Sequence, residues 1–175
     1  MKNGVCIALA LSSLTTWTIT WASGQTLTIS NVTVADFATV TLDGTAKSTT
    51  ATIDGFTVND TRLINDGWNV TVQATQFAEH NGTIYIPAGK TLPTGSLQMA
   101  QPTVAANGTL SPPPIITTGP YTIDGSSVKI ASAIATTGVG RYDFTQGGAL
   151  TLAIPASAFA LRYRSDLTIS VGAGP

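Results

Sequence analysis

Apolar and polar residues alternate most clearly just after the pair Asp66-Gly67. One side of the extended chain there carries Trp68, Val70, Val72 and Ala74. Asn, Thr and Gln residues occupy the other side, and because successive side chains of a strand point to opposite faces, the pattern predicts a strand with one buried face. Trp68 is in phase with the apolar residues, so we interpret it as a core residue. The alternative is a tryptophan at a strand edge or in a cleft, stacked on a sugar ring.

Short alternating runs recur along the chain between Asp-Gly and Asn-Gly pairs, which are strong turn signals. The predicted strands are Thr26 to Val34, Phe37 to Leu42, Ser48 to Ile53, Phe56 to Asn59, Trp68 to Phe77, Thr83 to Ile86, Ser96 to Val104, Tyr121 to Ile134, Arg141 to Phe144, Ala149 to Ile154 and Arg162 to Val171. Many short strands at regular spacing are typical of sandwiches and barrels. We therefore predict one all-β domain resembling an antiparallel β-sandwich.

The last predicted strand repeats the alternation. Its apolar face carries Tyr163, Ser165, Leu167, Ile169 and Val171. Arg164 and Asp166 are neighbours on the polar face, and we expect a surface ion pair worth at most about 1 kcal/mol.

The stretch from Val104 to Gly119 contains Pro112-Pro113-Pro114 and little alternation. Prolines cannot donate to a sheet ladder. We predict an exposed loop or a semi-rigid spacer in polyproline form.

Residues 1–24 have the pattern of a secretory signal peptide: Lys2, an apolar run from Val5 to Leu14, and small residues up to Gly24. The run is shorter than the roughly 20 residues that span a bilayer, although an extension through Trp21 keeps an uncleaved anchor open. We predict cleavage after Ala22 or Gly24 and a domain over residues 25–175. The only cysteine, Cys6, would leave with the signal, so no disulfide is expected.

Composition supports a secreted β-protein. Thirty residues are threonine and Glu79 is the sole glutamate, so helix formers are scarce. Charged residues make up 10% of the chain and the net charge is −1, which excludes the basic field that nucleic acid or anionic lipid requires. We expect an extracellular location at the cell surface or wall, with no nucleic-acid partner and no membrane contact after signal removal.

No catalytic or metal-ligating constellation is present. His80 is the only histidine, and beside Asn81-Gly82 it is interpreted as a turn residue. Asp43, Asp54, Asp66 and Asp124 each precede glycine, where their side chains stabilise turns. A glycosidase acid pair would have to come from the eight aspartates and Glu79. We expect neither enzyme activity nor a cofactor, and loop-bound calcium stays compatible with the sequence.

Five Asn-x-Ser/Thr triplets are possible glycosylation sites. They begin at Asn31, Asn59, Asn69, Asn81 and Asn107. In a chain so rich in threonine several would arise by chance.

Two regions of the sequence are informative when taken together. The first is Phe56 to Arg62, followed by Gly67-Trp68-Asn69-Val70-Thr71-Val72 and Phe77. The second is Leu150 to Phe159, followed by Tyr163 to Val171 and Gly174-Pro175. Together they resemble the two motif regions of the WxL cell-wall-binding domain family. The regions occur in the family's order, and the resemblance covers most of the predicted mature chain.

The resemblance implies a secreted, non-catalytic β-sandwich-like protein that attaches non-covalently to the Gram-positive cell wall, through peptidoglycan, and assembles with other surface proteins. The candidate ligand contacts are then Trp68, Val70, Tyr163 and Leu167, which the alternation equally assigns to the core. Val70 stands where the first motif has leucine. Ile169 and Val171 stand where the second has tryptophan and leucine, so a binding mode that needs a tryptophan pair would retain only Trp68.

The missing tryptophan leaves a structural alternative open: a subunit that self-assembles into an extracellular fibre or surface layer. The alternating segment Gln25 to Val34 is then a strand that one copy donates to an open sheet edge of the next. The opposing interpretation, which we favour, is that this segment pairs within its own domain.

Overall fold

The fold consists of strands. The computed structural model describes residues 9–11, 18–20, 25–30, 32–63, 66–109, 112–145 and 149–174, and every regular element in these ranges is a β-strand. The all-β prediction is confirmed. In the same ranges there is no helix with the length and apolarity to cross a bilayer.

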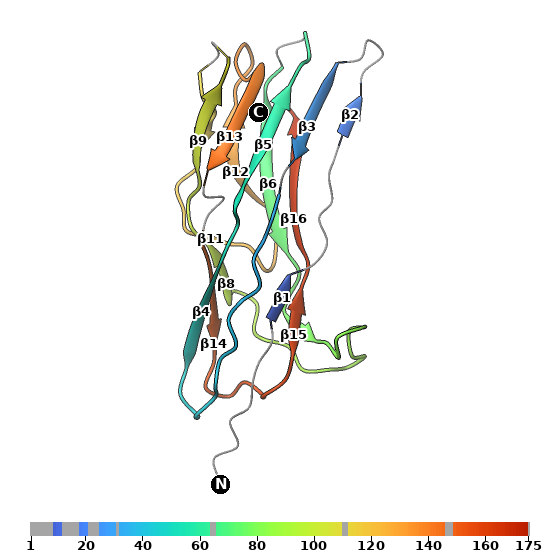
Figure 1. Cartoon of the computed structure of the whole chain (residues 1–175), viewed down its shortest axis with the longest axis vertical. Coiled ribbons are helices and arrows are strands. Elements are labelled where there is room, and N and C mark those ends of the chain that lie inside the picture. Colours follow the sequence, from blue (N-terminus) through green and yellow to red (C-terminus); the bar gives the residue numbers. More distant parts are fainter. Residues whose placement is uncertain are drawn as a thin grey trace.

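The strands form four sheets that together make an elongated molecule (Figure 1). The five-stranded sheet has the order β2 (Thr18–Thr20), β3 (Thr26–Ser30), β5 (Gly55–Asp60), β13 (Gly140–Thr145) and β9 (Thr103–Asn107). A four-stranded sheet lies behind it, with β10 (Ile115–Ile116), β12 (Val128–Ala133), β6 (Trp68–Ala74) and β16 (Leu167–Ala173). The other half contains β11 (Tyr121–Thr122), β8 (Leu97–Met99), β14 (Ala149–Ile154) and β4 (Lys47–Thr52), and a smaller sheet of β1 (Leu9–Leu11), β15 (Tyr163–Ser165) and β7 (Ala78–Glu79).

Two nearly continuous pairs of consecutive strands, β4–β5 and β15–β16, run through both halves of the molecule. β4 runs almost directly into β5, and these strands pair with β14 and β13 respectively. β15 likewise runs into β16 (Figure 1). Every described pairing is antiparallel except that of β1 with β15.

The core lies between the two sheets of one half and continues into the other. Trp68 of β6 and Tyr142 of β13 meet across it with ring centroids 5.6 Å apart, and Phe56 stacks on Phe144 at 4.4 Å. The alternation is confirmed: Trp68, Val70, Val72 and Ala74 are all buried. The same holds for Tyr163, Ser165, Leu167, Ile169 and Val171. Trp68 is therefore the core residue that its phase predicts.

β6 and β16 are neighbours although nearly a hundred residues separate them. Trp68 lies opposite Ala173, Val70 opposite Val171, and Val72 opposite Ile169. The two sequence regions singled out above thus build one antiparallel pair, whose apolar side faces the core.

A buried ion pair secures the crossover from β5 to β6. Asp60 and Arg62 are each 1% exposed, and the guanidinium donates from Nε and Nη2 to the carboxylate at 2.8 Å. Nη2 also donates to the carbonyl of Gly67 at 2.8 Å. The hydrogen bonds to Asp60 raise the pKa of Arg62 against the opposing effect of burial. The crossover is therefore held by polar bonds inside an apolar environment.

Two predicted strands are wrong. Phe37 to Leu42 forms no strand, only single bridges at Phe37 and Thr41, and Phe37 is buried with its ring 5.9 Å from that of Phe77. Thr83 to Ile86 is a turn region, because Asn81 Oδ1 accepts from the amides of Thr83 and Ile84.

Three predicted strands are interrupted. Pro102 separates β8 from β9, since proline cannot donate to a ladder. A turn at Asp124 separates β11 from β12. At Asp166, between β15 and β16, the amide donates to Thr75 Oγ1 and leaves the ladder.

The expected loop after Val104 is partly wrong. Residues 104–107 belong to β9, Pro114 is buried although Pro112 and Pro113 are exposed, and Ile115–Ile116 pairs with β12 as β10.

At the N-terminus, β3 pairs with β5, so Thr26–Ser30 pairs within its own domain as we favoured. Asn31 lies outside the described residues, as does most of the predicted signal apart from the backbone of β1 and β2. The signal, its cleavage and the domain boundary at residue 25 stay predictions.

We predict that Arg62→Leu destabilises the domain by about 3–5 kcal/mol, because it leaves the Asp60 carboxylate buried and unpaired. Urea unfolding of the purified protein measures the loss. The control is Asp43→Asn, which breaks the exposed Asp43–Lys47 pair and should shift the midpoint far less. Equal shifts in the two variants would contradict the role of the buried pair.

We also predict that Gly67→Ala lowers the free energy of unfolding much more than Gly44→Ala does. Both glycines have positive φ, +73° and +81°, so each alanine costs about 1–2 kcal/mol of backbone strain. A Cβ at position 67 would lie 2.2 Å from the carbonyl oxygen of Ala133, whereas at position 44 it meets nothing within 4 Å. We expect a further loss of ~1–3 kcal/mol at position 67 in urea unfolding. Equal stability of the two variants would refute the close approach.

Candidate functional site

The four candidate ligand contacts lie inside the molecule. Trp68 and Val70 are 0% exposed, Tyr163 is 1% exposed and Leu167 is 4% exposed. The indole Nε1 of Trp68 donates to the carbonyl of Gly138 at 2.8 Å, and the Tyr163 hydroxyl donates to the carbonyl of Phe159 at 3.1 Å. Each polar tip is thus satisfied within the fold. Ligand contact by these residues stays a prediction.

A polar surface lies on the outer side of the five-stranded sheet. The residues of β3, β5, β13 and β9 that point away from the core form rows across the strands, because directly opposed residues share a face. One row is Thr28, Asn59, Arg141 and Asn107, and the next is Ser30, Thr57, Asp143 and Ala105. We call these two rows the polar face. Nearly every side chain on it offers a hydroxyl, an amide or a charge.

Asp143 is the centre of the polar face. Its Oδ1 accepts from Thr57 Oγ1 at 2.8 Å and from Arg141 Nε at 3.0 Å, and its Oδ2 accepts from Asn107 Nδ2 at 2.5 Å. The Asn107 and Thr57 donors, followed by the Arg141 charge, lower the pKa of Asp143 below its ordinary value. Three strands therefore fix one carboxylate in its ionised form.

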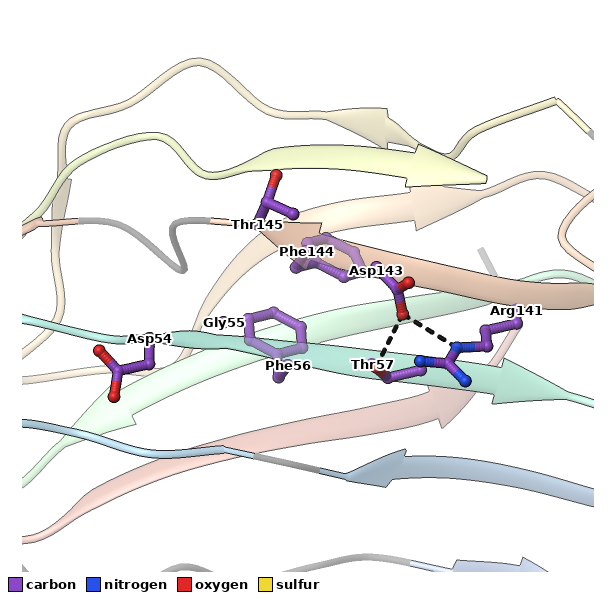
Figure 2. A pocket seen from close by; sticks show the side chains of 8 residues that line it. All are labelled: Asp54, Gly55, Phe56, Thr57, Arg141, Asp143, Phe144 and Thr145. Atoms are coloured by element: carbon purple, nitrogen blue, oxygen red, sulfur yellow. Dashed lines mark hydrogen bonds and ion pairs between the residues drawn. The ribbon is translucent and has the colours of Figure 1, made fainter. Parts of the chain in front are cut away.

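Arg141 reaches the solvent beside this carboxylate. Its side chain is 51% exposed, against 26% for Asp143. A shallow hollow of about 350 Å³ lies along β5 and β13 where they approach β4 and β14. In Figure 2 Arg141 and Thr57 point toward Asp143, while the Asp54 carboxylate is at the far end of the hollow. The hollow has a guanidinium at one end and a free carboxylate at the other.

The remaining predicted residues have mostly structural roles. His80 is buried, and its Nδ1 accepts from the amide of Gly82 at 2.9 Å, which confirms the turn interpretation. Arg164 and Asp166 form the expected weak pair, 3.7 Å apart. Asp43 stabilises its own turn through the amide and hydroxyl of Thr45.

Asp124 departs from the prediction. It is 1% exposed, and its carboxylate accepts from the amides of Gly95 and Leu97 at 2.9 and 3.0 Å. It therefore ties two loops together instead of stabilising its own turn.

The possible glycosylation sites differ in accessibility. Asn81 is exposed and its Oδ1 is occupied by the turn, while Asn69 and Asn107 use their Nδ2 atoms as donors, to Gly174 and Asp143. Asn59 is half-buried within the polar face. A glycan on Asn107 would break the Asp143 network.

Sequence reasoning did not find the Asp143 network. The signal available was local: Arg141 and Asp143 share the polar phase of a predicted strand, two residues apart. Thr57 and Asn107 come from strands 86 and 36 residues away, and their positions opposite Asp143 depend on pairing that a single sequence does not specify.

We predict that Asp143 titrates below about 3.9, the ordinary aspartate pKa, and that Asn107→Ala raises its pKa by removing the donor that lowers it most. Because the pKa is depressed in the fold, the stability it contributes is present above the ordinary pKa and is lost as pH falls through the folded value. Carboxyl ¹³C shifts measured against pH test this, with Asn69→Ala on the other sheet as control. An unchanged pKa in Asn107→Ala would contradict the network.

Comparison with known proteins gives one match. A family model described as the WxL domain, surface cell wall-binding, matches residues 18–175, which is nearly the whole chain. No curated protein and no solved structure matches this chain. The match contains both paired strands β6 and β16 and the whole polar face. The chain therefore belongs to the WxL family of surface cell-wall-binding domains.

Proposed function

We propose that this cell-wall-binding surface protein attaches non-covalently to peptidoglycan through its polar face. The observation that supports this is the Asp143 network, a fixed arrangement of charge and hydrogen-bonding groups on an open sheet surface. The alternative contacts around Trp68 are enclosed in the core.

Peptidoglycan has groups that match this face chemically. Its peptide stems carry carboxylates, which a guanidinium binds through charge-assisted hydrogen bonds. Its glycan strands carry hydroxyl and amide groups, which can bond to Thr28, Asn59 and Asn107 across the strands. Arg141 donates to Asp143 through Nε, and its side chain is half-exposed, so its remaining donors are accessible to a ligand.

The proposed binding is non-catalytic. A glycosidase of the common kind needs a carboxylic acid whose pKa is raised so that it can protonate the leaving group. Asp143, the carboxylate at the centre of the face, has a lowered pKa and three donors that hold it ionised. Intact sacculi incubated with the protein should release no soluble fragments.

A fibre subunit built by donation of Gln25 to Val34 is less well supported. The central part of that segment, Thr26–Ser30, is already hydrogen-bonded to β5 of its own chain. Donation would require this strand to leave the sheet and expose Leu27 and Ile29, which are core residues.

We predict that Arg141→Ala weakens binding to purified sacculi on the order of tenfold, since a charge-assisted hydrogen bond contributes about 1.5–3 kcal/mol. The measurement is the fraction of secreted protein that pellets with walls stripped of other polymers. The matched control is Lys129→Ala, which removes an exposed cation from β12 of the opposite sheet and should bind like the wild type. Digestion of the glycan strands before mixing should abolish pelleting.

Two outcomes would count against the proposal. If Lys129→Ala binds as weakly as Arg141→Ala, the attraction depends on net charge and not on the polar face. If Trp68→Phe folds normally but no longer pellets, the indole itself contacts the ligand and the predicted site at Trp68 takes precedence.

A further inference from the structure

Two strand edges on one flank of the molecule are covered by the N-terminal segment of the chain itself. β2 pairs antiparallel with β3, with Ile19 opposite Leu27, and β1 pairs parallel with β15, with Leu9 opposite Tyr163. Figure 1 shows β1 and β2 along the flank where β15, β16 and β3 lie. We call the backbone edge of Thr26–Ser30 together with that of Tyr163–Ser165 the acceptor edge.

The hydrogen-bonding direction of β3 can be derived residue by residue. The Thr26 carbonyl accepts from the amide of Thr61, and the Thr26 amide donates to the Thr61 hydroxyl, so the polar backbone groups of Thr26 face β5. In an antiparallel strand alternate residues point their amides and carbonyls to opposite sides. Thr28 therefore also faces β5, whereas Leu27 faces β2.

The β3 part of the acceptor edge lacks the usual protection. Proteins shield open edges with charges, prolines or bulges, because unpaired amides and carbonyls recruit other strands. Thr26-Leu27-Thr28-Ile29-Ser30 contains no charge and no proline. Among the residues that the structure describes, the only strand on this side of β3 is β2, which belongs to the segment predicted to be a cleaved signal.

We propose that loss of the signal segment during secretion leaves the acceptor edge unfilled and that an extended segment of a partner surface protein then occupies it as an added strand. The groups that recognise this segment are the Leu27 backbone on β3 and the β1-facing backbone of β15. We expect the partner segment to alternate apolar and hydroxyl residues, as Thr18-Ile19-Thr20 does in the same position beside β3. The acceptor edge binds through backbone groups of β3 and β15, whereas the polar face binds through side chains around Asp143 and Arg141, so failure of one proposal can be distinguished from failure of the other.

A second copy of the processed chain is a poorer occupant. Its first strand would be Thr26–Ser30, which is hydrogen-bonded to its own β5. The buried apolar residues whose burial is described lie between Leu27 and Val171, so we expect the chain from residue 25 to fold on its own.

The test uses secreted protein whose N-terminus has been established by mass spectrometry, with a fluorescent peptide of residues 9–20 as probe. We expect saturable binding to the secreted form and much weaker binding to the unprocessed chain, whose own segment covers the edge. N-methylation of Ile19, whose amide faces β3, should weaken binding on the order of tenfold by removing one hydrogen bond and blocking close approach. N-methylation of Thr20, whose amide faces away, is the matched control and should change binding less than about twofold.

Hydrogen exchange gives a second readout. The Leu27 amide should exchange rapidly in the secreted form and slow down when the peptide binds, whereas the Thr28 amide should be protected in both states. Absence of peptide binding, or equal weakening by the two N-methyl groups, would overturn the proposal. So would a Leu27 amide already protected in a dimer, or a secreted chain that retains residues 9–20, because the edge would then be filled without a partner.

Discussion

The buried pair of Asp60 and Arg62 is the interaction on which the arrangement of the two sheets most depends. It stands where the chain leaves β5 of the front sheet and enters β6 of the rear sheet, and the same guanidinium holds the carbonyl of Gly67. A charge pair in such a place offers little net stability compared with apolar side chains, because both partners lose their hydration. What it provides is geometry: the planar guanidinium binds the Asp60 carboxylate and the Gly67 carbonyl together, which ties the end of β5 to the start of β6.

Gly67 and Trp68, the residues of the first motif that follow this pair, have packing roles in the fold. Gly67 admits the backbone close to the end of β12, and Trp68 then bridges the sheets through Tyr142 and the Gly138 carbonyl. The distal motif supplies the neighbouring strand β16. Ile169, which stands where the resemblance places a tryptophan, is 3% exposed and lies opposite Val72, so this position belongs to the core and not to the polar face.

Features that depend on residues close together in the sequence were predicted correctly more often than features that depend on contacts between distant segments. The faces of β6 and of β15–β16 were predicted correctly because alternation is a property of consecutive residues, and the buried Trp68 follows from its phase. The strand expected over Thr83 to Ile86 failed because Asn81 offered its amides a local partner. Asp143, Asp124 and Arg62 escaped prediction for a different reason: each side chain depends on a backbone or side chain brought in by pairing between distant strands or by a crossover.

The adjacency of β6 and β16 also constrains the order in which the chain can fold. Residues 68–74 have one sheet partner from β12 and the other from residues 167–173, so the central strand of the rear sheet stays half-paired until nearly the whole chain is available. Contacts between such distant segments form slowly, since loop closure precedes any gain from pairing. A protein exported from its N-terminus would thus reach the far side of the membrane still unfolded, in a form that a narrow translocation channel can thread, and would complete its core only outside the cell.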